Sequence, residues 1–335
     1  FFLDGGALAV ENAMKIAFDW KTHRNLRLGR GERGSEIIHF RQAFHGRSGY
    51  TMSVTNTDPN KVRHFPKFPW PRIINPRMRF PFEGANREDT LEDERAAIHE
   101  IKDVMAAKRE DIAAILIEPI QGEGGDNHFR PEFLRALRDL ADENDVLLIF
   151  DEVQTGMGMT GHAWAWQGLG VEPDLFAFAK KAQVGGVAAG PRIMEEEKNC
   201  FTVPSRISST WGGSLVDMVR CTRYLEIIEE EDLLRNARER GTEIVAGLRA
   251  IEERTELIHN VRGAGLFIAC DLEYPETRAQ LLEDLHGAGL MCLGCGTGSV
   301  RFRPHLNVTN DVIGEALGVF EAVLRRTQAP VTHAI

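Results

Sequence analysis

The chain lacks long apolar runs, and its positive charges never gather into a block. Its longer apolar stretches resemble IAAILI at 112–117, well short of the roughly 20 residues that a membrane-spanning helix needs. The formal net charge is −10, which disfavours binding to the phosphates of nucleic acids. We therefore expect neither a membrane nor a nucleic acid among the partners of this chain.

Cysteine is scarce, and its five positions are scattered at 200, 221, 270, 292 and 295. An odd, dispersed set is typical of reduced thiols, so we expect a cytoplasmic protein without a disulfide framework. Cys292 and Cys295 do stand in a Cys-x-x-Cys pair. Because no second pair of ligands accompanies them, we predict no metal site.

Two further absences concern the start of the chain. The glycines in GGALAVENA at 5–13 do not form the G-x-G-x-x-G fingerprint of dinucleotide-binding folds, which disfavours a nicotinamide-dependent dehydrogenase. An initiator methionine is also missing, and FFLDGGALAVENAMK at 1–15 begins in what the pattern predicts to be the interior of a structured unit. We therefore expect that an N-terminal segment is missing before Phe1.

What the chain does contain is an alternation of short apolar strands and helices. The 335 residues are 43% hydrophobic, enough for a large core and more than one domain. Strands are predicted at 36–40, 112–118, 146–151 and 174–180, with helices at 7–21, 92–108 and 131–144. Apolar strands separated by helices indicate an α/β domain whose parallel sheet is covered on both faces.

The last part of the chain has a different pattern. After a helical stretch at 213–254, strands at 266–272 and 300–304 mix with helices at 276–288 and 310–326. We predict a large domain over residues 1–230 and a smaller α+β domain over residues 231–335.

Charged residues follow three of the predicted strands, at Glu118, Asp151 and Lys180. Ligands of open α/β sheets bind at the carboxyl ends of strands, so these residues mark the candidate site. A carboxylate at the tip of the buried strand VLLIFD needs a positive partner, although a helix cap or a loop ion pair would also explain Asp151. Lys180 suits Schiff-base chemistry, because partial desolvation favours a neutral amine; the alternative is a solvated lysine.

The stretch GGALAVENA supplies a third element of the candidate site. Two glycines and an alanine at a helix start present bare backbone N–H groups, which favour a phosphate, although a plain tight turn would share this composition. A phosphate site, a carboxylate and an amine together indicate one cofactor, pyridoxal 5'-phosphate.

Several motifs then show a family resemblance over essentially the whole chain: DEVQTG (151–156), AFHGR (43–47), EPIQGEGG (118–125), FAKK (178–181), SSTWGG (208–213) and VRF (300–302). The chain resembles the class III (ω-amino acid) aminotransferases of fold type I. FHGRSGYT, FPKFPWPRI, FRPEF, PSRISSTWGG and VRFRP place the resemblance in the lysine 6-aminotransferase branch, with one departure at Ser208, where asparagine is expected. The resemblance implies a large, doubly wound, mostly parallel sheet domain plus a smaller C-terminal α+β domain, working as a homodimer with shared active sites.

The resemblance also assigns roles to residues. Lys180 bonds the cofactor aldehyde and moves the proton, with Lys181 as the competing candidate, and Asp151 pairs with the pyridine nitrogen. The other implied cofactor contacts are Val153 and Phe44 on the two ring faces, Gln154 near the phenolic oxygen, Gly6 and Ala7 on the phosphate, and Ser209 and Thr210 on the phosphate in the neighbouring subunit.

Two arginines carry the substrate logic of the family, because a guanidinium binds a carboxylate in a two-pronged fork. Arg47 resembles the residue that holds the distal carboxylate, and Arg301 the one that takes the α-carboxylate of the keto acid. Glu123 resembles the glutamate that pairs with Arg301 until that carboxylate arrives. A surface Arg47 and a purely structural Glu123–Arg301 pair are the alternatives, and we expect Glu118 to give structural support.

The implied reaction, a step of lysine catabolism, moves the ε-amino group of L-lysine to 2-oxoglutarate, giving 2-aminoadipate 6-semialdehyde, which can cyclise, and L-glutamate. The same chemistry on ornithine or 4-aminobutyrate remains open, because the pocket that measures chain length cannot be located in the sequence. A non-catalytic sensing module with this fold is the alternative of another class, but both reactive groups, Lys180 and Asp151, are present.

Overall fold

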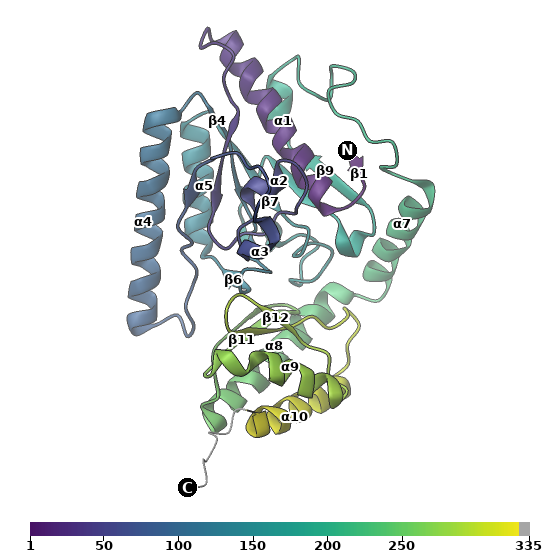
Figure 1. The fold of residues 1–335 in the computed structure, drawn as a ribbon. Helices are drawn as coiled ribbons and strands as arrows, with labels where there is room; N and C mark the ends of the chain where they lie inside the picture. The colour runs from purple at the N-terminus through teal and green to yellow at the C-terminus, as the bar shows by residue number, and fades with distance from the viewer. Residues whose placement is uncertain (328–335) are drawn as a thin grey trace.

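The computed structural model describes residues 1–327 and contains two main sheets (Figure 1). The larger has seven strands in the order β1-β9-β8-β7-β4-β2-β3, and the smaller has four in the order β10-β11-β13-β12. The large sheet comprises β1 Phe2–Leu3, β2 Glu36–Phe40, β3 Arg72–Ile73, β4 Ile112–Ile117, β7 Leu147–Asp151, β8 Leu175–Phe178 and β9 Gly185–Ala189. The small sheet comprises β10 Ile258–Ala264, β11 Phe267–Leu272, β12 Leu293–Cys295 and β13 Ser299–Phe302, and a separate ribbon pairs β5 Ile120–Gln121 with β6 Asn127–His128.

Helices surround both sheets. They are α1 Gly6–Arg27, α2 Thr51–Val54, α3 Pro59–Val62, α4 Gly84–Lys108, α5 Pro131–Glu143, α6 Ala165–Leu169, α7 Leu215–Glu230, α8 Leu233–Thr255, α9 Arg278–Gly287 and α10 Asn310–Thr327, with 3₁₀ turns η1 Lys180–Ala182, η2 Pro191–Glu195 and η3 Pro275–Thr277. Among residues 1–327, none of the helices is both long and apolar enough to cross a membrane.

The large sheet is mostly parallel, because β2, β3, β4, β7 and β8 run in one direction and β9 returns antiparallel to β8. Helices cover both of its faces, as alternate residues of β7 show. Leu147 and Ile149 join a core cluster with α1, whereas Leu148 and Phe150 join a cluster with α4 and α5. The predicted doubly wound α/β fold is confirmed, and it places the carboxyl ends of β4, β7 and β8 side by side.

The small sheet is antiparallel throughout and has its own core, in which Leu248 of α8, Phe267 of β11 and Phe320 of α10 pack together. It lies below the large sheet in Figure 1, and α7 runs along the side of the molecule between the two. The proposed boundary at 230/231 falls in the short turn between α7 and α8. Residues 328–335 of the predicted small domain lie outside the described residues.

The strand predicted at 174–180 is shorter than expected. It ends at Phe178, and Lys180 opens the turn η1 with a positive φ of 41°. β9 was not predicted, because GGVAA at 185–189 has the glycine content of a loop. The helix predicted at 92–108 begins earlier, at Gly84.

Substitutions in the sheet should separate core from surface. Leu148→Ala removes a fully buried side chain of β7 and should lower the thermal midpoint by at least about 4 °C, because it leaves a cavity between packed layers. Leu26→Ala, at a position 51% exposed, is the matched control and should change it by less than about 1 °C. Differential scanning calorimetry of both variants checks this, and equal shifts would contradict the layer assignment.

Candidate active site

The three predicted strand-end residues meet at one cavity of about 260 Å³. Glu118 follows β4, Asp151 ends β7, and Lys180 stands just beyond β8. All of the cofactor residues predicted for this subunit's own site line the cavity, namely Gly6, Ala7, Phe44, Asp151, Val153, Gln154 and Lys180. The site thus forms at the edge where parallel α/β sheets hold their ligands.

Asp151 is 4% exposed and held from two sides. Its Oδ1 accepts a hydrogen bond from the backbone N–H of Val153 at 3.0 Å, and its Oδ2 lies 2.8 Å from Nδ1 of His45. The side chain of His45 is itself fully buried. Sequence reasoning missed His45, although it stands between Phe44 and Arg47 in the motif AFHGR. Together with the N–H of Val153, His45 fixes the orientation of the Asp151 carboxylate.

Glu118 lines the cavity and binds the backbone of two loops. Its carboxylate accepts hydrogen bonds from the backbone N–H groups of Phe44 at 3.0 Å and Gly122 at 3.1 Å. Burial raises the pKa of Glu118, an effect that His45 opposes and the nearby Asp151 reinforces. These contacts agree with the predicted structural role.

Two adjacent lysines compete for the reactive position. Burial lowers the pKa of Lys181 to about 7, and desolvation also lowers the pKa of Lys180, against the raising effect of Asp151 and Glu118. The pKa alone would favour Lys181. The Nζ of Lys181, however, donates to the backbone carbonyl of Gln154, whereas Lys180 lines the cavity. Position therefore favours Lys180.

The N-terminus of α1 opens into the cavity without a protein cap. Gly5 provides no side-chain cap, and the first turn contains no acidic residue, so the N–H groups of Gly6 and Ala7 are available to an anion. Gly6 has no room for a side chain, because a Cβ there would lie 2.7 Å from Cγ1 of Val153. Gly46 lies against the same turn, because a Cβ built on Gly46 would be 2.6 Å from the Cβ of Ala7.

The two predicted substrate arginines differ in their partners. Arg47 is exposed while lining the cavity, and it forms no ion pair among residues 1–327. Arg301 is mostly buried, and only its Nη2 contacts Glu123, at 3.4 Å from Oε2. Its Nε and Nη1 are buried without a hydrogen-bond partner in the described part of the chain. By contrast, Arg303, which follows the last residue of β13, is held by both carboxylate oxygens of Asp126.

Glu123 has a second partner that the sequence did not indicate. Its Oε1 accepts a hydrogen bond from the Nζ of Lys61, which belongs to α3. No motif marks Lys61, and it lies far from Glu123 in the chain. Because its carboxylate has two cationic partners, Glu123 does not form an exclusive ion pair with Arg301.

Ser209 and Thr210 do not line this cavity. Ser209 accepts a hydrogen bond from the backbone N–H of Gly212 at 3.0 Å, next to the backbone of Phe2, and Thr210 is exposed. The assignment of both residues to a neighbouring subunit stays a prediction.

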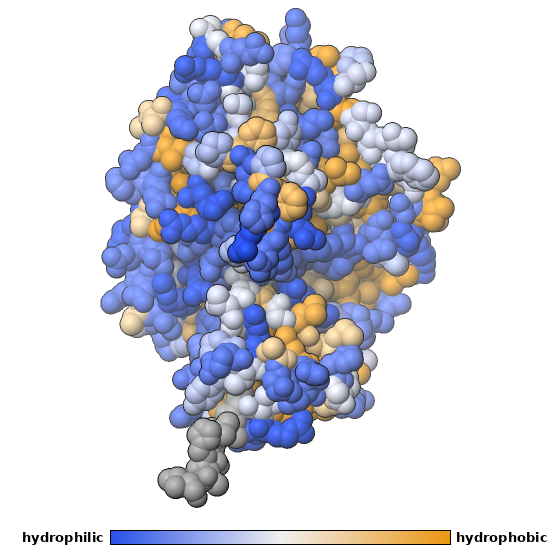
Figure 2. All heavy atoms as spheres, viewed as in Figure 1, coloured by the Kyte–Doolittle hydropathy of each residue, from blue (hydrophilic) through white to orange (hydrophobic). Residues whose placement is uncertain are grey.

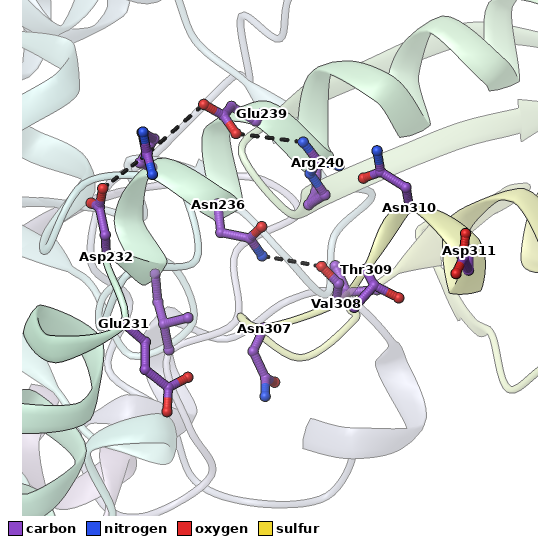
Figure 3. Close-up of a pocket in the computed structure, with 12 residues that line it drawn as sticks. Glu231, Asp232, Asn236, Glu239, Arg240, Asn307, Val308, Thr309, Asn310 and Asp311 are labelled. Carbon is purple, nitrogen blue, oxygen red and sulfur yellow. Dashed lines mark hydrogen bonds and ion pairs between the residues drawn. The ribbon is translucent and has the colours of Figure 1, made fainter.

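A wider hollow of about 580 Å³ lies between α8 and the start of α10 (Figure 3). Some of its polar groups bond to one another or to nearby backbone: Asn236 donates to the carbonyl of Leu306 at 2.7 Å, and Arg240 contacts Glu239 at 3.4 Å. None of the predicted site residues lines it. The smaller cavity at the strand ends is therefore the candidate active site.

The family follows from a comparison with known proteins. The model of the family described as Aminotransferase class-III matches residues 1–324. The chain belongs to the class III aminotransferases. The predicted resemblance is thereby confirmed.

Individual relatives align with most of the length of this aminotransferase chain. It is 50% identical over 329 residues to the L-lysine-epsilon aminotransferase of Amycolatopsis lactamdurans, covering 97% of this chain and 72% of that one. It is 54% identical over 249 residues to the enzyme of the same name from Mycobacterium tuberculosis, covering 74% of this chain but only 55% of that one. The solved lysine aminotransferase from M. tuberculosis in the internal aldimine form has a TM-score of 0.95 at 47% identity, covering 98% of this chain and 75% of that one.

The cofactor of class III aminotransferases is pyridoxal phosphate, as predicted, and the cavity fits it. The uncapped start of α1 suits the phosphate, the buried Asp151 suits a protonated ring nitrogen, and Lys180 faces the space between them. When bound, the cofactor supplies an aldehyde carbon and a ring that accepts electrons. Among residues 1–327, no three His, Cys, Asp or Glu side chains lie close enough to hold a metal ion.

Exchange of each lysine should separate the two candidates. Lys180→Ala should reduce turnover by more than roughly 100-fold, because it removes the group that moves the proton, and should abolish the bond to the cofactor. Lys181→Ala, the matched control, should stay within roughly tenfold of the wild type, since Lys181 only donates to the carbonyl of Gln154. Visible absorbance and steady-state rates measure both effects, and the reverse order would exclude Lys180.

A side chain at Gly6 should weaken cofactor binding. Gly6→Ala should raise the dissociation constant of pyridoxal phosphate by roughly tenfold, because the new methyl group must displace Val153 from the helix start. Gly314→Ala in α10 is the control, since a Cβ there meets nothing within 4 Å. Titration of the cofactor-free protein, followed by absorbance, gives the two constants. An unchanged constant for Gly6→Ala would show that this turn does not bind the phosphate.

Proposed function

We propose that this chain transfers the ε-amino group of L-lysine to 2-oxoglutarate, giving L-glutamate and 2-aminoadipate 6-semialdehyde, which can cyclise. The observation that carries the proposal is one cavity that joins a reactive lysine, a fixed carboxylate and an open helix N-terminus. The relatives named above, which are L-lysine-epsilon aminotransferases at 50% and 54% identity, support the donor.

Lys180 acts as base and acid in this proposal. Desolvation lowers its pKa, which raises the fraction of neutral amine, the form that accepts a proton. Its Nζ would accept the proton released from the ε-carbon of the substrate and would hold it for return within the same cavity. Asp151, oriented by His45, pairs with the ring nitrogen and keeps it protonated.

Arg47 and Arg301 divide the substrate carboxylates between them. Arg47, free of ion pairs within the described residues, holds the α-carboxylate of lysine or the γ-carboxylate of 2-oxoglutarate. The unpartnered Nε and Nη1 of Arg301 suit the α-carboxylate of the keto acid, and Glu123 occupies Nη2 until that carboxylate arrives. The donor and the acceptor can therefore use one pocket in turn.

A second donor deserves a test, because a relative uses it. The mitochondrial 4-aminobutyrate aminotransferase of Homo sapiens is 32% identical over 344 residues, covering 95% of this chain and 67% of that one. The higher identity to the lysine enzymes favours lysine over 4-aminobutyrate. A non-catalytic sensing role is disfavoured by the placement of Lys180 and Asp151 in one cavity.

The proposed enzyme is a homodimer, and α7 supports this. Its residues are all at least partly exposed in the single chain, and Leu215, Val216 and Val219 are 83%, 74% and 71% exposed. Trp211, next to Ser209 and Thr210, is 74% exposed. Apolar surface gathers over α7 in Figure 2. An apolar helix face of this kind is typical of a subunit interface, and it adjoins the two residues predicted to serve the neighbouring site.

A reducing compartment is part of the proposal. All five cysteines are free, including Cys292 and Cys295, which supports the predicted cytoplasmic location.

A donor panel tests the function directly. The purified protein, loaded with pyridoxal phosphate and supplied with 2-oxoglutarate, should form glutamate fastest with L-lysine and more slowly with ornithine and 4-aminobutyrate. If the pocket fits the length of lysine, a donor one methylene shorter should lose roughly 10-fold or more in kcat/KM. Glutamate is quantified by chromatography, and the cyclised product by its absorbance. If another amine reacts faster than L-lysine, that amine is the donor and the lysine assignment is wrong.

A further inference from the structure

The carboxylate of Glu123 lies between two cations that come from different parts of the chain. Oε1 accepts a hydrogen bond from Lys61 of α3, and Oε2 faces Arg301 of β13 at 3.4 Å. The side chains of Lys61 and Glu123 are 27% and 28% exposed, whereas that of Arg301 is only 13% exposed. The carboxylate is thus bonded closely to the outer cation and loosely to the inner one.

We propose that Lys61 is a positioning residue that holds Glu123 when a dicarboxylate acceptor displaces it from Arg301. The inference rests on the proposed function, in which Arg301 receives a substrate carboxylate. It adds a residue that lets Glu123 leave Arg301 without losing its counter-charge.

The geometry explains why a second cation is needed. The backbone of Glu123 is fixed, since its carbonyl accepts a hydrogen bond from the N–H of Gly296 at 2.9 Å. Only its side chain can move, and a half-buried carboxylate that leaves Arg301 without another cation would be poorly stabilised. Lys61 offers that cation beside Phe44, which lines the cavity, so Glu123 keeps one ion pair in both positions.

Lys61 is itself held in place. Its Nζ lies 5.4 Å from the centre of the ring of Phe44, a distance at which a cation is attracted to the face of an aromatic ring. Phe44 is anchored in turn, because its N–H donates to Glu118. The ammonium group is therefore directed towards Glu123 rather than free in solvent.

The test measures binding of glutarate, a dicarboxylate of the length of 2-oxoglutarate without its reactive ketone, to the holoenzyme by isothermal titration calorimetry. Lys61→Met should raise the dissociation constant roughly fivefold, as expected for loss of a partly exposed ion pair. It should also raise KM for 2-oxoglutarate more than KM for L-lysine. Lys61→Arg should restore binding to within about twofold, because it keeps the charge.

A double-mutant comparison separates an action through Glu123 from a direct contact with the ligand. In a Glu123→Gln background, which has no carboxylate to displace, Lys61→Met should change glutarate binding by less than about twofold. Arg63→Met is the charge-matched control on the same segment. The side chain of Arg63 is exposed and forms no ion pair in the described chain, so this variant should bind glutarate like the wild type.

Several results would overturn the inference. Unchanged or tighter glutarate binding by Lys61→Met would do so, as would the same loss in the Glu123→Gln background or in Arg63→Met. If the wild type binds no glutarate, the proposed acceptor falls and this inference with it. If glutarate binds as expected but L-lysine is not a donor, only the donor assignment fails, and the comparison of variants still decides the role of Lys61.

Discussion

The site depends on a carboxylate that is held, almost without solvent, at the tip of a buried strand. The carboxylate of Asp151 is held in position by the N–H of Val153 and the imidazole of His45. A second buried carboxylate, Glu118, lies close to Asp151 and strengthens the preference of the site for a cation. The parallel sheet makes this arrangement possible, since its layers bury the strands and leave only their ends open. In the proposed function, the protonated ring of the bound cofactor would be that cation.

The order of the elements and much of the cavity could be predicted from the sequence, because local patterns determine them. Apolar runs that end in Glu118 and Asp151 placed those residues at a sheet edge, and the glycines before α1 indicated a phosphate site. His45 and Lys61 could not be assigned in this way. Their contacts with Asp151 and Glu123 join segments far apart in the chain, and no periodicity links such segments. The turn at Lys180 also escaped prediction, since the apolar pattern continues past the last strand residue, Phe178.

The pair Lys180 and Lys181 shows that a lowered pKa identifies a reactive amine only together with the place of that amine in the site. Both Lys180 and Lys181 have a lowered pKa through desolvation, so that criterion does not identify the reactive amine. What separates them is the direction set by the η1 turn, in which Lys180 adopts a left-handed backbone conformation. This turn sends one amine into the cavity and leaves the next to a backbone carbonyl. A strained backbone at a reactive residue is expected where the surrounding structure fixes its direction.

The hydrogen bond from the N–H of Gly296 to the carbonyl of Glu123 links an exposed hairpin to the proposed acceptor site. Gly296 sits in the tight connection between β12 and β13, outside the cavity, yet its N–H holds the backbone of Glu123, the residue proposed to pair with Arg301 between substrates. An insertion or deletion in that connection would therefore shift the backbone of Glu123 without touching the residues that line the cavity at the strand ends. The length of a hairpin outside the cavity is in this way coupled to the position of a side chain in the proposed acceptor site.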